Sequence, residues 1–455
     1  MAGKHSHTIS FRALVKKSQF KPVIFITTFA LFGALFLFIS HASTITASLE
    51  TENGSIIGPA QLTTDSSASG GTAIQFGGTQ TTVSPPLSIA SDCSIAVDTQ
   101  LASWIATVPD GSIIQFSKNA CYGVDQTIYV SGRNNLTFDG NGATFKALTL
   151  QDVAYSGQNR AIWRINGGST ITLENMIVWG ASDGRFSAPT HDLEWQHGVA
   201  FDGGSNMILK NSTIKNVYGD FVEFQYLDGS ANETLATAAV NGTVFNNTFN
   251  NSNRQGIGIS DGSHITIDSN TITSANADAI DIEPDVSSEA ADHITINNNI
   301  FSGAQNAFDL GFGGYSWSGL VHDIIFTNNK DLALRPTCSS EMVTSSRSAI
   351  AGTTPISNVT ISGNTGYSLT DGFGVFDTFN NLTVTNNTIH GDGNGCDPIP
   401  GGVALANSKT YSVTNNIFLG YEPSKGGAGA VRDYGGNSGA TITGNICEQN
   451  PNLPC

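Results

Sequence analysis

A short phrase of alternating apolar and polar residues, closed by an asparagine, recurs through most of the chain after residue 136. It occurs at residues 136–141, 265–270, 294–299, 324–329, 359–364, 382–387, 411–416 and 440–445. Such a period indicates one structural unit stacked on itself, each unit burying its apolar face against its neighbours. The 455 residues can therefore form one long repeat domain.

A second apolar strand accompanies the phrase in most repeats. It occurs at residues 162–165, 199–201, 222–224, 257–259, 280–282, 308–310, 373–375 and 403–405. The spacing from Phe245 to Ile267 is only 22 residues. Two or three short strands in so short a repeat, rich in Thr and Ile, predict an all-β fold, a parallel β-helix. The asparagine at the turn tolerates a left-handed backbone, and its amide can bond to the asparagine one coil away.

The N-terminal segments differ in composition from the repeats. Residues 1–21 are basic without an acid, and residues 22–40 are almost wholly apolar, which favours a cytoplasmic tail and a transmembrane anchor. Small residues at 40–42 leave open the alternative of a cleaved signal segment and a secreted protein. Residues 41–90 are rich in Ser, Thr, Gly and Ala and predict a flexible linker. Residues 91–455 are the predicted β-helix domain.

The first coil carries a further signal. The apolar spacing of residues 101–108 predicts a short helix before a strand at 113–116. A helix there would cap the stack, whose first strands would otherwise present unpaired edges.

All six cysteines lie beyond the apolar segment. None is spaced as C-x-x-C, which favours disulfides over metal binding. We expect each pair to close an end or a long loop, as Cys93–Cys121, Cys338–Cys396 and Cys447–Cys455.

The net charge restricts the partners. A formal charge of −17 would repel a phosphate backbone, so nucleic acid is excluded as a partner. A polyanionic substrate would need a cation or a local basic group, and Arg254 is the one basic residue placed near acids.

Residues 91–455 resemble the right-handed β-helix superfamily that includes pectate lyases, polygalacturonases and phage tailspikes. The capping helix, Asp-Gly-Ser before the first strand and the asparagine ladder carry this resemblance. Residues 254–259, followed by 278–284, resemble adjoining coils of polysaccharide-active and tailspike-like members. The Gln-His-Gly at 196–198 resembles a polygalacturonase element, but it precedes Gly219-Asp220 and no Asp-Asp pair is present. The resemblance implies a right-handed β-helix that takes a polysaccharide or oligosaccharide.

Aligning the second strands predicts which side chains are neighbours, since adjacent strands lie about 4.8 Å apart. The inward column is Val199, Val222, Ile257, Ile280 and Phe308. The outward column after it is Ala200, Glu223, Gly258, Asp281 and Asp309. The column two places earlier is His197, Asp220, Gln255, Asp278 and Asn306. Ionisable groups thus converge on one lateral face, whereas the later coils continue with Gly374 and Ala404.

Departures from the repeat lie close to these acids. After Leu173, Leu209 and Phe245 the asparagine comes one place earlier, at Asn175, Asn211 and Asn247. These coils flank the insertions and the first acids, and therefore mark the region of the predicted site.

Glu223 and Asp281 are the predicted acid and base. They lie two coils apart, roughly 9.6 Å, and Gly258 between them leaves a gap that could admit a sugar. Carboxylates about 6.5 to 9.5 Å apart suit inverting hydrolysis. Asp281 and Asp309, about 5 Å apart, would instead suit a retaining geometry.

The polar residues next to this pair can each have either a functional role or a purely structural one. Asp220, Asp278, Glu283 and Asp309 are expected to tune the pair or bind substrate, with strand capping as the alternative for Asp220 and Asp278. Arg254 would orient the substrate or pair with Asp220 and Asp278. His197 would shuttle a proton, orient the substrate or form a hydrogen-bonding wall.

Aromatic residues in the insertions are candidate sugar platforms. Trp195, Tyr226 and Trp317 could stack on sugar faces, or could instead pin the loops. No cofactor is expected; Ca²⁺ is a lesser alternative through the oxygens of Asp278, Asp281, Glu283 and Asp285.

These observations favour an exported, surface-anchored glycoside hydrolase. A polysaccharide lyase or epimerase is an alternative, although lysine is scarce on the acidic face and only Arg254 could supply the basic group. A non-catalytic adhesin that uses the β-helix as a spacer and glycan-binding face is the other alternative.

Overall fold

The computed structural model describes residues 60–64, 72–76, 80–149, 161–183, 193–227, 238–284, 288–310, 320–332, 340–345, 355–391, 401–421 and 429–447. The chain divides into two units, Met1–Phe76 and Gly77–Cys455. In the first unit, β1 (Ala60–Thr64) and β2 (Thr72–Phe76) pair antiparallel. This pair falls within the stretch predicted to be a linker.

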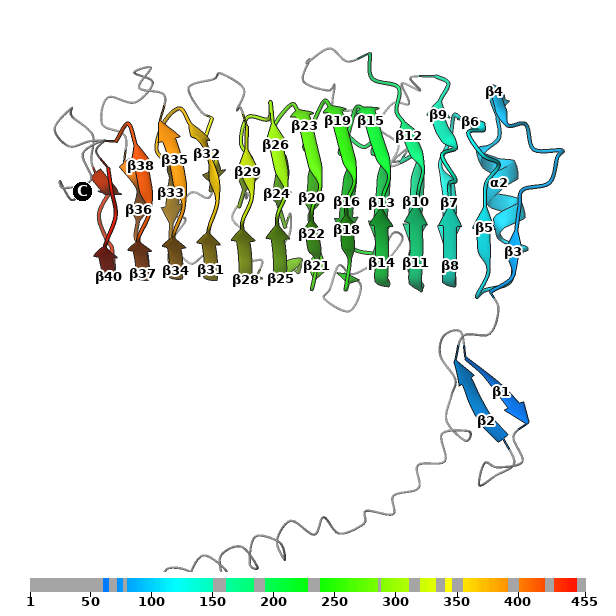
Figure 1. Cartoon of the computed structure of the whole chain (residues 1–455), viewed down its shortest axis with the longest axis horizontal. Helices are drawn as coiled ribbons and strands as arrows, with labels where there is room; N and C mark the ends of the chain where they lie inside the picture. The colour runs from blue at the N-terminus through cyan, green and yellow to red at the C-terminus, as the bar shows by residue number, and fades with distance from the viewer. Residues whose placement is uncertain are drawn as a thin grey trace, which may run out of the picture. The chain divides into compact units, whose positions relative to one another are not determined.

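The second unit is a solenoid of three parallel sheets, with successive coils side by side (Figure 1). Sheet 1 contains β7 (Ile128–Ser131), β10 (Trp163–Asn166), β13 (Val199–Asp202), β16 (Val222–Gln225), β20 (Ile257–Ile259), β24 (Ile280–Ile282), β27 (Phe308–Asp309), β30 (Val343–Thr344), β33 (Phe373–Asp377), β36 (Gly401–Ala406) and β39 (Gly429–Asp433).

Sheet 2 contains β3 (Thr82–Val83), β5 (Ile113–Gln115), β8 (Asn134–Asp139), β11 (Ser169–Glu174), β14 (Ser205–Lys210), β17 (Ala239–Val240), β18 (Thr243–Phe245), β21 (Gly262–Ser263), β22 (Thr266–Asp268), β25 (Ala290–Asn297), β28 (Leu320–Thr327), β31 (Ile356–Ser362), β34 (Phe379–Thr385), β37 (Lys409–Thr414) and β40 (Ser438–Thr443). Sheet 3 contains β4 (Asp92–Ala96), β6 (Cys121–Val124), β9 (Thr144–Ala147), β12 (Ile177–Trp179), β15 (Thr213–Val217), β19 (Thr248–Ser252), β23 (Thr271–Ala275), β26 (Ile300–Ser302), β29 (Lys330–Asp331), β32 (Thr365–Ser368), β35 (Thr388–Gly391) and β38 (Ile417–Leu419). The predicted all-β parallel β-helix is confirmed.

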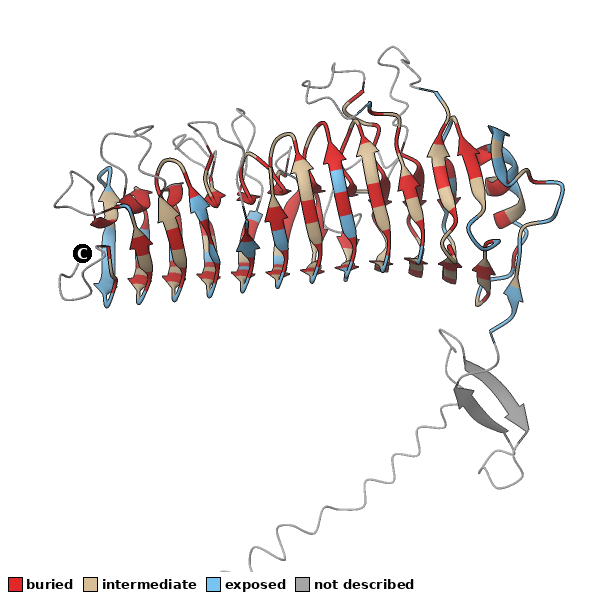
Figure 2. Ribbon diagram, turned by 45° about the horizontal axis from the view of Figure 1, so that its top comes forward, coloured by how far each residue is buried: buried red, intermediate tan, exposed pale blue. Residues whose placement is uncertain are grey.

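The core fills the inside of the coils. Inward side chains from all three sheets are buried, and exposed residues concentrate on the outer surface (Figure 2). Near the N-terminal end, Trp163 contacts the rings of Phe116, Phe138 and Phe145 at centroid distances of 4.9 to 6.1 Å. Burying the inward side chains on neighbouring coils is what stabilises the stack, because no coil has a core of its own.

The recurring asparagine forms the predicted ladder. Asn270 is buried, and its Oδ1 accepts hydrogen bonds from both the backbone N–H and Nδ2 of Asn247, at 2.9 and 3.0 Å. The same two bonds link each later pair, and the ladder comprises Asn247, Asn270, Asn299, Asn329, Asn364, Asn387, Asn416 and Asn445. These residues satisfy buried backbone donors at a turn, a structural role.

The left-handed conformation falls mainly on another residue. The residue before each ladder position adopts it, as Ser269 (φ 59°) and Asn298 (φ 55°) do. The prediction gave both tasks to one asparagine, but the bonding amide and the turn conformation belong to consecutive residues.

The coil of Phe245 is not shifted, contrary to the prediction. Val244, buried, pairs with Ile267, whereas Phe245 is 41% exposed and pairs with Asp268. Asn247 therefore sits at the regular ladder position. In the preceding coil Ser212 takes this place, and its N–H donates to Asn247 Oδ1 at 2.9 Å.

Helix α2 (Asp98–Ile105) confirms the predicted cap. Leu101 and Ile105 face the core, and Arg133 from a later coil donates to the carbonyl of Ile105 at 2.7 Å. The Asp98 carboxylate accepts the N–H of Gln126 at 3.1 Å. Because β3 already pairs with β5, the β-helix begins before the predicted boundary at residue 91.

The predicted Cys93–Cys121 disulfide is present and links β4 to β6. Cys447 is also disulfide-bonded, and Cys338, Cys396 and Cys455 lie outside the described residues. Among the described helices none is long and apolar enough to cross a membrane. The predicted tail and anchor, residues 1–21 and 22–40, lie outside the described part.

Candidate functional site

The strand register confirms the predicted outward column on sheet 1 from Ala200 to Asp309, but farther along a register shift pairs Ala404 with Val375 and not with Gly374. Glu223 pairs with Ala200 and Gly258. Asp281 pairs with Gly258 on one side and with Asp309 on the other. We call this region the acidic face and define it by Asp220, Glu223, Asp278, Asp281 and Asp309, together with Arg254, Gln255 and Glu283.

The structure adds two residues to the outward column that the sequence analysis did not include. Arg164 pairs with Ala200, and Thr344 pairs with Asp309. Arg164 is 4% exposed and forms an ion pair with Asp202 at 2.9 Å. The strand at 162–165 was predicted, so extending the column by one coil would have found this arginine.

Glu223 is a buried carboxyl group. Its Oε1 accepts from Ser260 Oγ at 2.6 Å, and its carboxyl group shares a hydrogen bond with that of Asp220. Burial, reinforced by the nearby Asp220 carboxylate, raises the pKa of Glu223 well above its ordinary value. Glu223 is therefore suited to hold a proton.

Asp220 joins this carboxyl to Arg254. Its Oδ2 lies 2.5 Å from Arg254 NH1, and its Oδ1 accepts the backbone N–H of Gln255 at 2.9 Å. Burial raises the pKa of Asp220, and the Arg254 charge opposes that rise. Pairing and strand capping, the structural alternatives for Arg254 and Asp220, are thus both present.

Arg254 lies at the rim of the face. A second guanidinium nitrogen lies 3.0 Å from Glu283 Oε2, and the Arg254 side chain is 23% exposed. Burial lowers the pKa of Arg254, but the surrounding carboxylates outweigh it and raise it. Arg254 and Glu283 are the charged groups through which the buried part of the face meets solvent.

Asp281 is the second buried carboxyl group. Gln255 Nε2 donates to its Oδ2, and to Glu283 Oε2 at 3.0 Å, while Asp281 Oδ1 has no hydrogen-bond partner in the described part of the chain. Burial raises the pKa of Asp281 well above its ordinary value, and the carboxylates of Glu283 and Asp309 add to the rise. Gln255 is a contact residue that the prediction placed in a column without a role.

Asp278 also has a structural role in the turn. Its Oδ1 accepts from Asn306 Nδ2 at 2.6 Å, and Asn306 Oδ1 accepts the N–H of Glu341 at 2.9 Å. Asp309 is 7% exposed and pairs with Asp281 on the neighbouring strand.

His197 is not placed to shuttle protons. It is 1% exposed, and its Nδ1 accepts the backbone N–H of Asp220 at 2.9 Å. Burial lowers its pKa well below 6.5, so the ring is neutral with the proton on Nε2. Trp195, half-buried, meets His197 edge-on at a centroid distance of 6.2 Å and so helps to pack this corner.

The gap predicted at Gly258 is filled. The Oε2 oxygen of Glu223 lies where a Cβ atom of residue 258 would stand. Glu223 and Asp281 are each only 3% exposed. Gly258 therefore leaves room for the Glu223 carboxyl group and not for a sugar in this conformation.

The remaining predicted binding residues are less informative. Tyr226 is half-buried directly after β16, whereas Trp317 and Asp285 lie outside the described residues. His197, Asp220 and Glu223 bring possible metal-ligand atoms within 4.8 Å of one another. However, His197 Nδ1 already accepts the backbone N–H of Asp220, and the Asp220 carboxylate is already paired with Arg254, so this group is less suited to bind a metal ion.

The sequence matches the protein family described as the right-handed β-helix region, over residues 105–350 and 235–446. The chain belongs to this family. No curated protein matches it.

Three solved structures share the fold at low identity. The tailspike protein of E. coli bacteriophage HK620, solved in complex with a pentasaccharide, is 11% identical with a TM-score of 0.56, covering 85% of this chain and 70% of that one. PfbA, a surface adhesin of Streptococcus pneumoniae, is 13% identical (TM-score 0.55; 82% and 93%). The family 28 exopolygalacturonase of Yersinia enterocolitica is 12% identical (TM-score 0.53; 84% and 80%). At these identities the likeness defines the fold, and the chemistry must be argued from the residues.

Proposed function

We propose that this protein acts on a polysaccharide as a glycoside hydrolase, with Glu223 and Asp281 as its acid and base. The observation that carries the proposal is the pair itself: two buried carboxyl groups with raised pKa values on one face of the β-helix. Groups tuned in this way collect at catalytic sites. The similar folds of a tailspike bound to a pentasaccharide and of an exopolygalacturonase support the substrate class.

Glu223 acts as the general acid. Its raised pKa keeps it protonated, so Oε2 can donate to the glycosidic oxygen as the bond to the leaving sugar breaks. After the reaction Glu223 regains a proton from water, and Asp281 releases to water the proton that it took up; Asp220, held by Arg254, keeps its place beside Glu223.

Asp281 acts as the general base. Its raised pKa makes the ionised form of Asp281 a stronger proton acceptor, and Oδ1 is the oxygen left to take a proton from water, since Gln255 donates to Oδ2. Two coils separate Asp281 from Glu223, roughly 9.6 Å at the backbone. Side chains that lean together from that distance fall in the range of inverting enzymes, so we expect inversion at the anomeric carbon.

The substrate approaches from the rim. Arg254 and Glu283, partly exposed, are suited to hydrogen-bond sugar hydroxyl groups, and Arg254 can also hold a sugar carboxylate. The Glu223 side chain must turn away from Gly258 to admit a sugar ring.

The burial of the pair favours a second candidate, a glycan-binding adhesin. With both carboxyl groups 3% exposed, the face would offer only its rim and would carry no chemistry. The similar fold of the surface adhesin PfbA, of which the alignment covers 93%, supports this alternative.

A glycan screen with the full-length protein separates the candidates. Release of reducing ends without new ultraviolet absorbance identifies a hydrolase. Reducing ends together with ultraviolet absorbance from unsaturated ends identify a lyase, and retention without either product identifies an adhesin. For a hydrolase we expect Glu223→Gln and Asp281→Asn each to lower kcat by about 10²- to 10⁴-fold. Asp268→Asn, a change of a carboxylate on β22 of sheet 2, is the matched control and should leave kcat unchanged. Full activity in both site variants would refute the assignment.

We further propose that the protein is exported and held by residues 22–40 in the membrane. The apolar length of this segment and the basic residues before it support an anchor. N-terminal sequencing of the protein from its native host distinguishes this from a cleaved segment: a first residue near 43 would exclude the anchor.

A further inference from the structure

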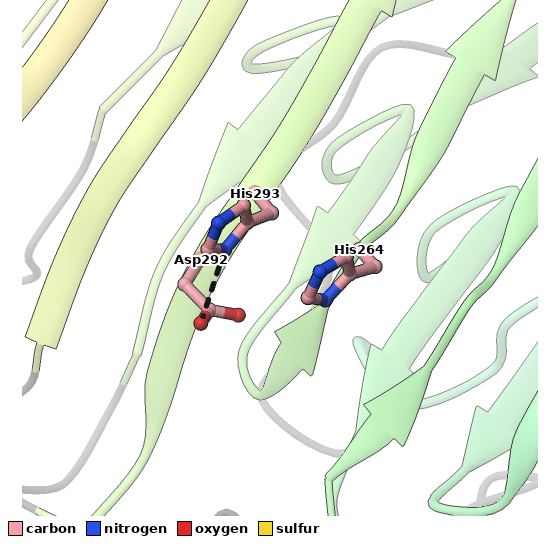
Figure 3. Close-up of side chains that lie close together, drawn as sticks. All are labelled: His264, Asp292 and His293. Carbon is pink, nitrogen blue, oxygen red and sulfur yellow. Dashed lines mark ion pairs between the residues drawn. The ribbon is translucent and has the colours of Figure 1, made fainter. Parts of the chain in front are cut away.

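A second group of ligand-type side chains lies on sheet 2, apart from the acidic face. His264 follows β21, and Asp292 and His293 belong to β25 on the next coil. One nitrogen of each imidazole and one carboxylate oxygen lie within 4.8 Å of one another. Figure 3 shows the two rings side by side, with the carboxylate next to His293.

The spacing of His293 and Asp292 suits a shared ion. His293 Nδ1 lies 3.4 Å from Asp292 Oδ2, too long for a good hydrogen bond. A zinc ion with Zn–N near 2.0–2.1 Å and Zn–O near 2.0–2.2 Å in tetrahedral geometry separates its ligand atoms by about 3.4 Å. This pair therefore needs little movement to bind.

His264 can join from the adjacent coil. Its ring stacks on that of His293 with a centroid distance of 4.4 Å and an angle of 4°. Its Nδ1 is hydrogen-bonded to Ser263 Oγ at 2.7 Å, the kind of outer contact that fixes a metal-binding imidazole and leaves the other nitrogen for the ion. Both histidines are exposed, so a small rotation of each ring can bring one nitrogen of each toward a shared ion.

Asp292 gives an independent indication that a partner belongs here. Its Oδ1 is buried and has no hydrogen-bond partner among the described residues. An unpaired buried carboxylate oxygen is costly, and a cation that the carboxylate binds through both oxygens would remove that cost.

A neighbouring group is less suited. His322 and Asp323 share His293 with the first group. However, Asp323 is already committed: its Oδ2 lies 2.5 Å from His322 Nδ1, and its Oδ1 accepts from Asn358 Nδ2 at 2.9 Å. The first group has no such commitment at Asp292.

The group also has an entry path. His264 and His293 line an open groove of about 570 Å³ that continues past Thr295 and Asn358. An ion held by three protein ligands would keep a fourth position facing this groove, the arrangement of an open zinc site.

We propose that His264, Asp292 and His293 bind a divalent transition metal of the zinc class. Two imidazoles and one carboxylate suit Zn²⁺ and exclude a calcium-type site, which takes oxygen ligands. This inference does not depend on the function proposed for the acidic face.

Titration calorimetry of the full-length protein with ZnCl₂, purified without a histidine tag, tests the proposal. We expect a saturable site in the wild type and at least tenfold weaker binding at that site in His264→Ala and His293→Ala. His390→Ala, which removes a half-buried histidine that contacts Tyr367 on sheet 3, is the matched control and should bind as the wild type does. CaCl₂ should give no binding at this site.

Electron paramagnetic resonance of the Cu²⁺-loaded protein supplies a second readout that does not depend on affinity. We expect coupling to two imidazole nitrogens in the wild type and to one in His264→Ala, with circular dichroism confirming that the variant is folded. Unchanged zinc affinity in His293→Ala, or an unchanged copper spectrum in His264→Ala, would overturn the proposal, as would the lack of a saturable zinc site.

Discussion

The Oε2 oxygen of Glu223 occupies the space that a Cβ atom would need at Gly258, the residue paired with it on the next coil. The φ angle of Gly258 is not in the left-handed region, so its backbone does not require glycine. The Glu223 side chain requires it, because a Cβ atom would collide with the carboxyl group. The position of the buried carboxyl group thus depends on the absence of an atom one coil away.

Gly258→Ala should displace the Glu223 carboxyl group. Overpacking a buried position costs about 1–3 kcal/mol, so we expect that loss in the free energy of unfolding, measured in urea. In an active hydrolase kcat should also fall. Gly262→Ala is the control, since its Cβ would meet the apolar side chains of Ile259 at 3.1 Å and Ile265 at 3.2 Å and no carboxyl group of the acidic face. Equal behaviour of the two variants in the kcat assay would contradict this account.

Stability should fall as the pH rises because of the buried acids. The pKa values of Glu223 and Asp281 are raised well above 4.5 and 3.8, so the folded protein holds these protons more tightly than the unfolded chain. Their contribution is complete below the ordinary values and is lost as the pH rises through the raised ones.

Urea unfolding between about pH 4 and about pH 9 measures this effect. The double variant with Glu223→Gln and Asp281→Asn cannot ionise at these positions, so it should lose that part of the decline. His197, whose pKa is lowered, contributes stability above 6.5 that is lost as the pH falls, but it does so in both proteins and cancels in the comparison. Parallel curves for the two proteins would show that the carboxyl groups titrate normally.

The asparagine ladder should carry measurable stability at each position. Asn299→Ala removes an Nδ2 group that donates to Ile267 O at 2.9 Å and to Asn329 Oδ1 at 3.1 Å, and leaves Asn270 without its acceptor. Each unsatisfied buried group costs about 1–3 kcal/mol, so we expect a loss of about 2–4 kcal/mol in urea unfolding. Asn298→Gly, at the exposed left-handed position beside it, should change stability by less than about 0.5 kcal/mol. If both variants matched the wild type, the ladder would not be an energetic feature.

The Cys93–Cys121 disulfide should stabilise the N-terminal end of the β-helix. It closes a loop with a sequence separation of 28 that contains helix α2. Loop-closure entropy for such a length corresponds to about 3–4 kcal/mol. Replacing both cysteines by serine should lower the free energy of unfolding by that amount and increase hydrogen exchange in α2. Unchanged exchange in α2 would show that the strand pairing alone holds the cap.

The periodic residues explain why the fold could be predicted from the sequence. A ladder asparagine such as Asn270 and an inward residue such as Ile280 recur at the spacing of one coil, so the neighbours of each residue follow from counting. The register of the acidic column follows in the same way. Where two apolar residues stand side by side, as Val244 and Phe245 do, counting allows two alignments, and only packing selects Val244 for the core.

The sequence predicted which residues share the acidic face, but not their side-chain conformations or hydrogen-bond partners. The sequence brought Glu223 and Asp281 to one face, yet it placed an open gap at Gly258 where the structure has a carboxyl group. It also gave His197 a chemical role, whereas a backbone bond to Nδ1 fixes that ring as a buried acceptor. Rotamers and hydrogen-bond partners depend on atoms from neighbouring coils, which spacing does not encode.

The sequence by itself determined the repeat, the parallel β-helix, the capping helix, the Cys93–Cys121 pair and the face on which the acids converge, because each depends on short periods or local patterns. The tertiary structure alone decided that the acid pair is buried with raised pKa values and that His264 meets His293 and Asp292 on another sheet. Burial and the meeting of side chains are properties of the packed coils, since they depend on what surrounds each atom and not on its place in the repeat.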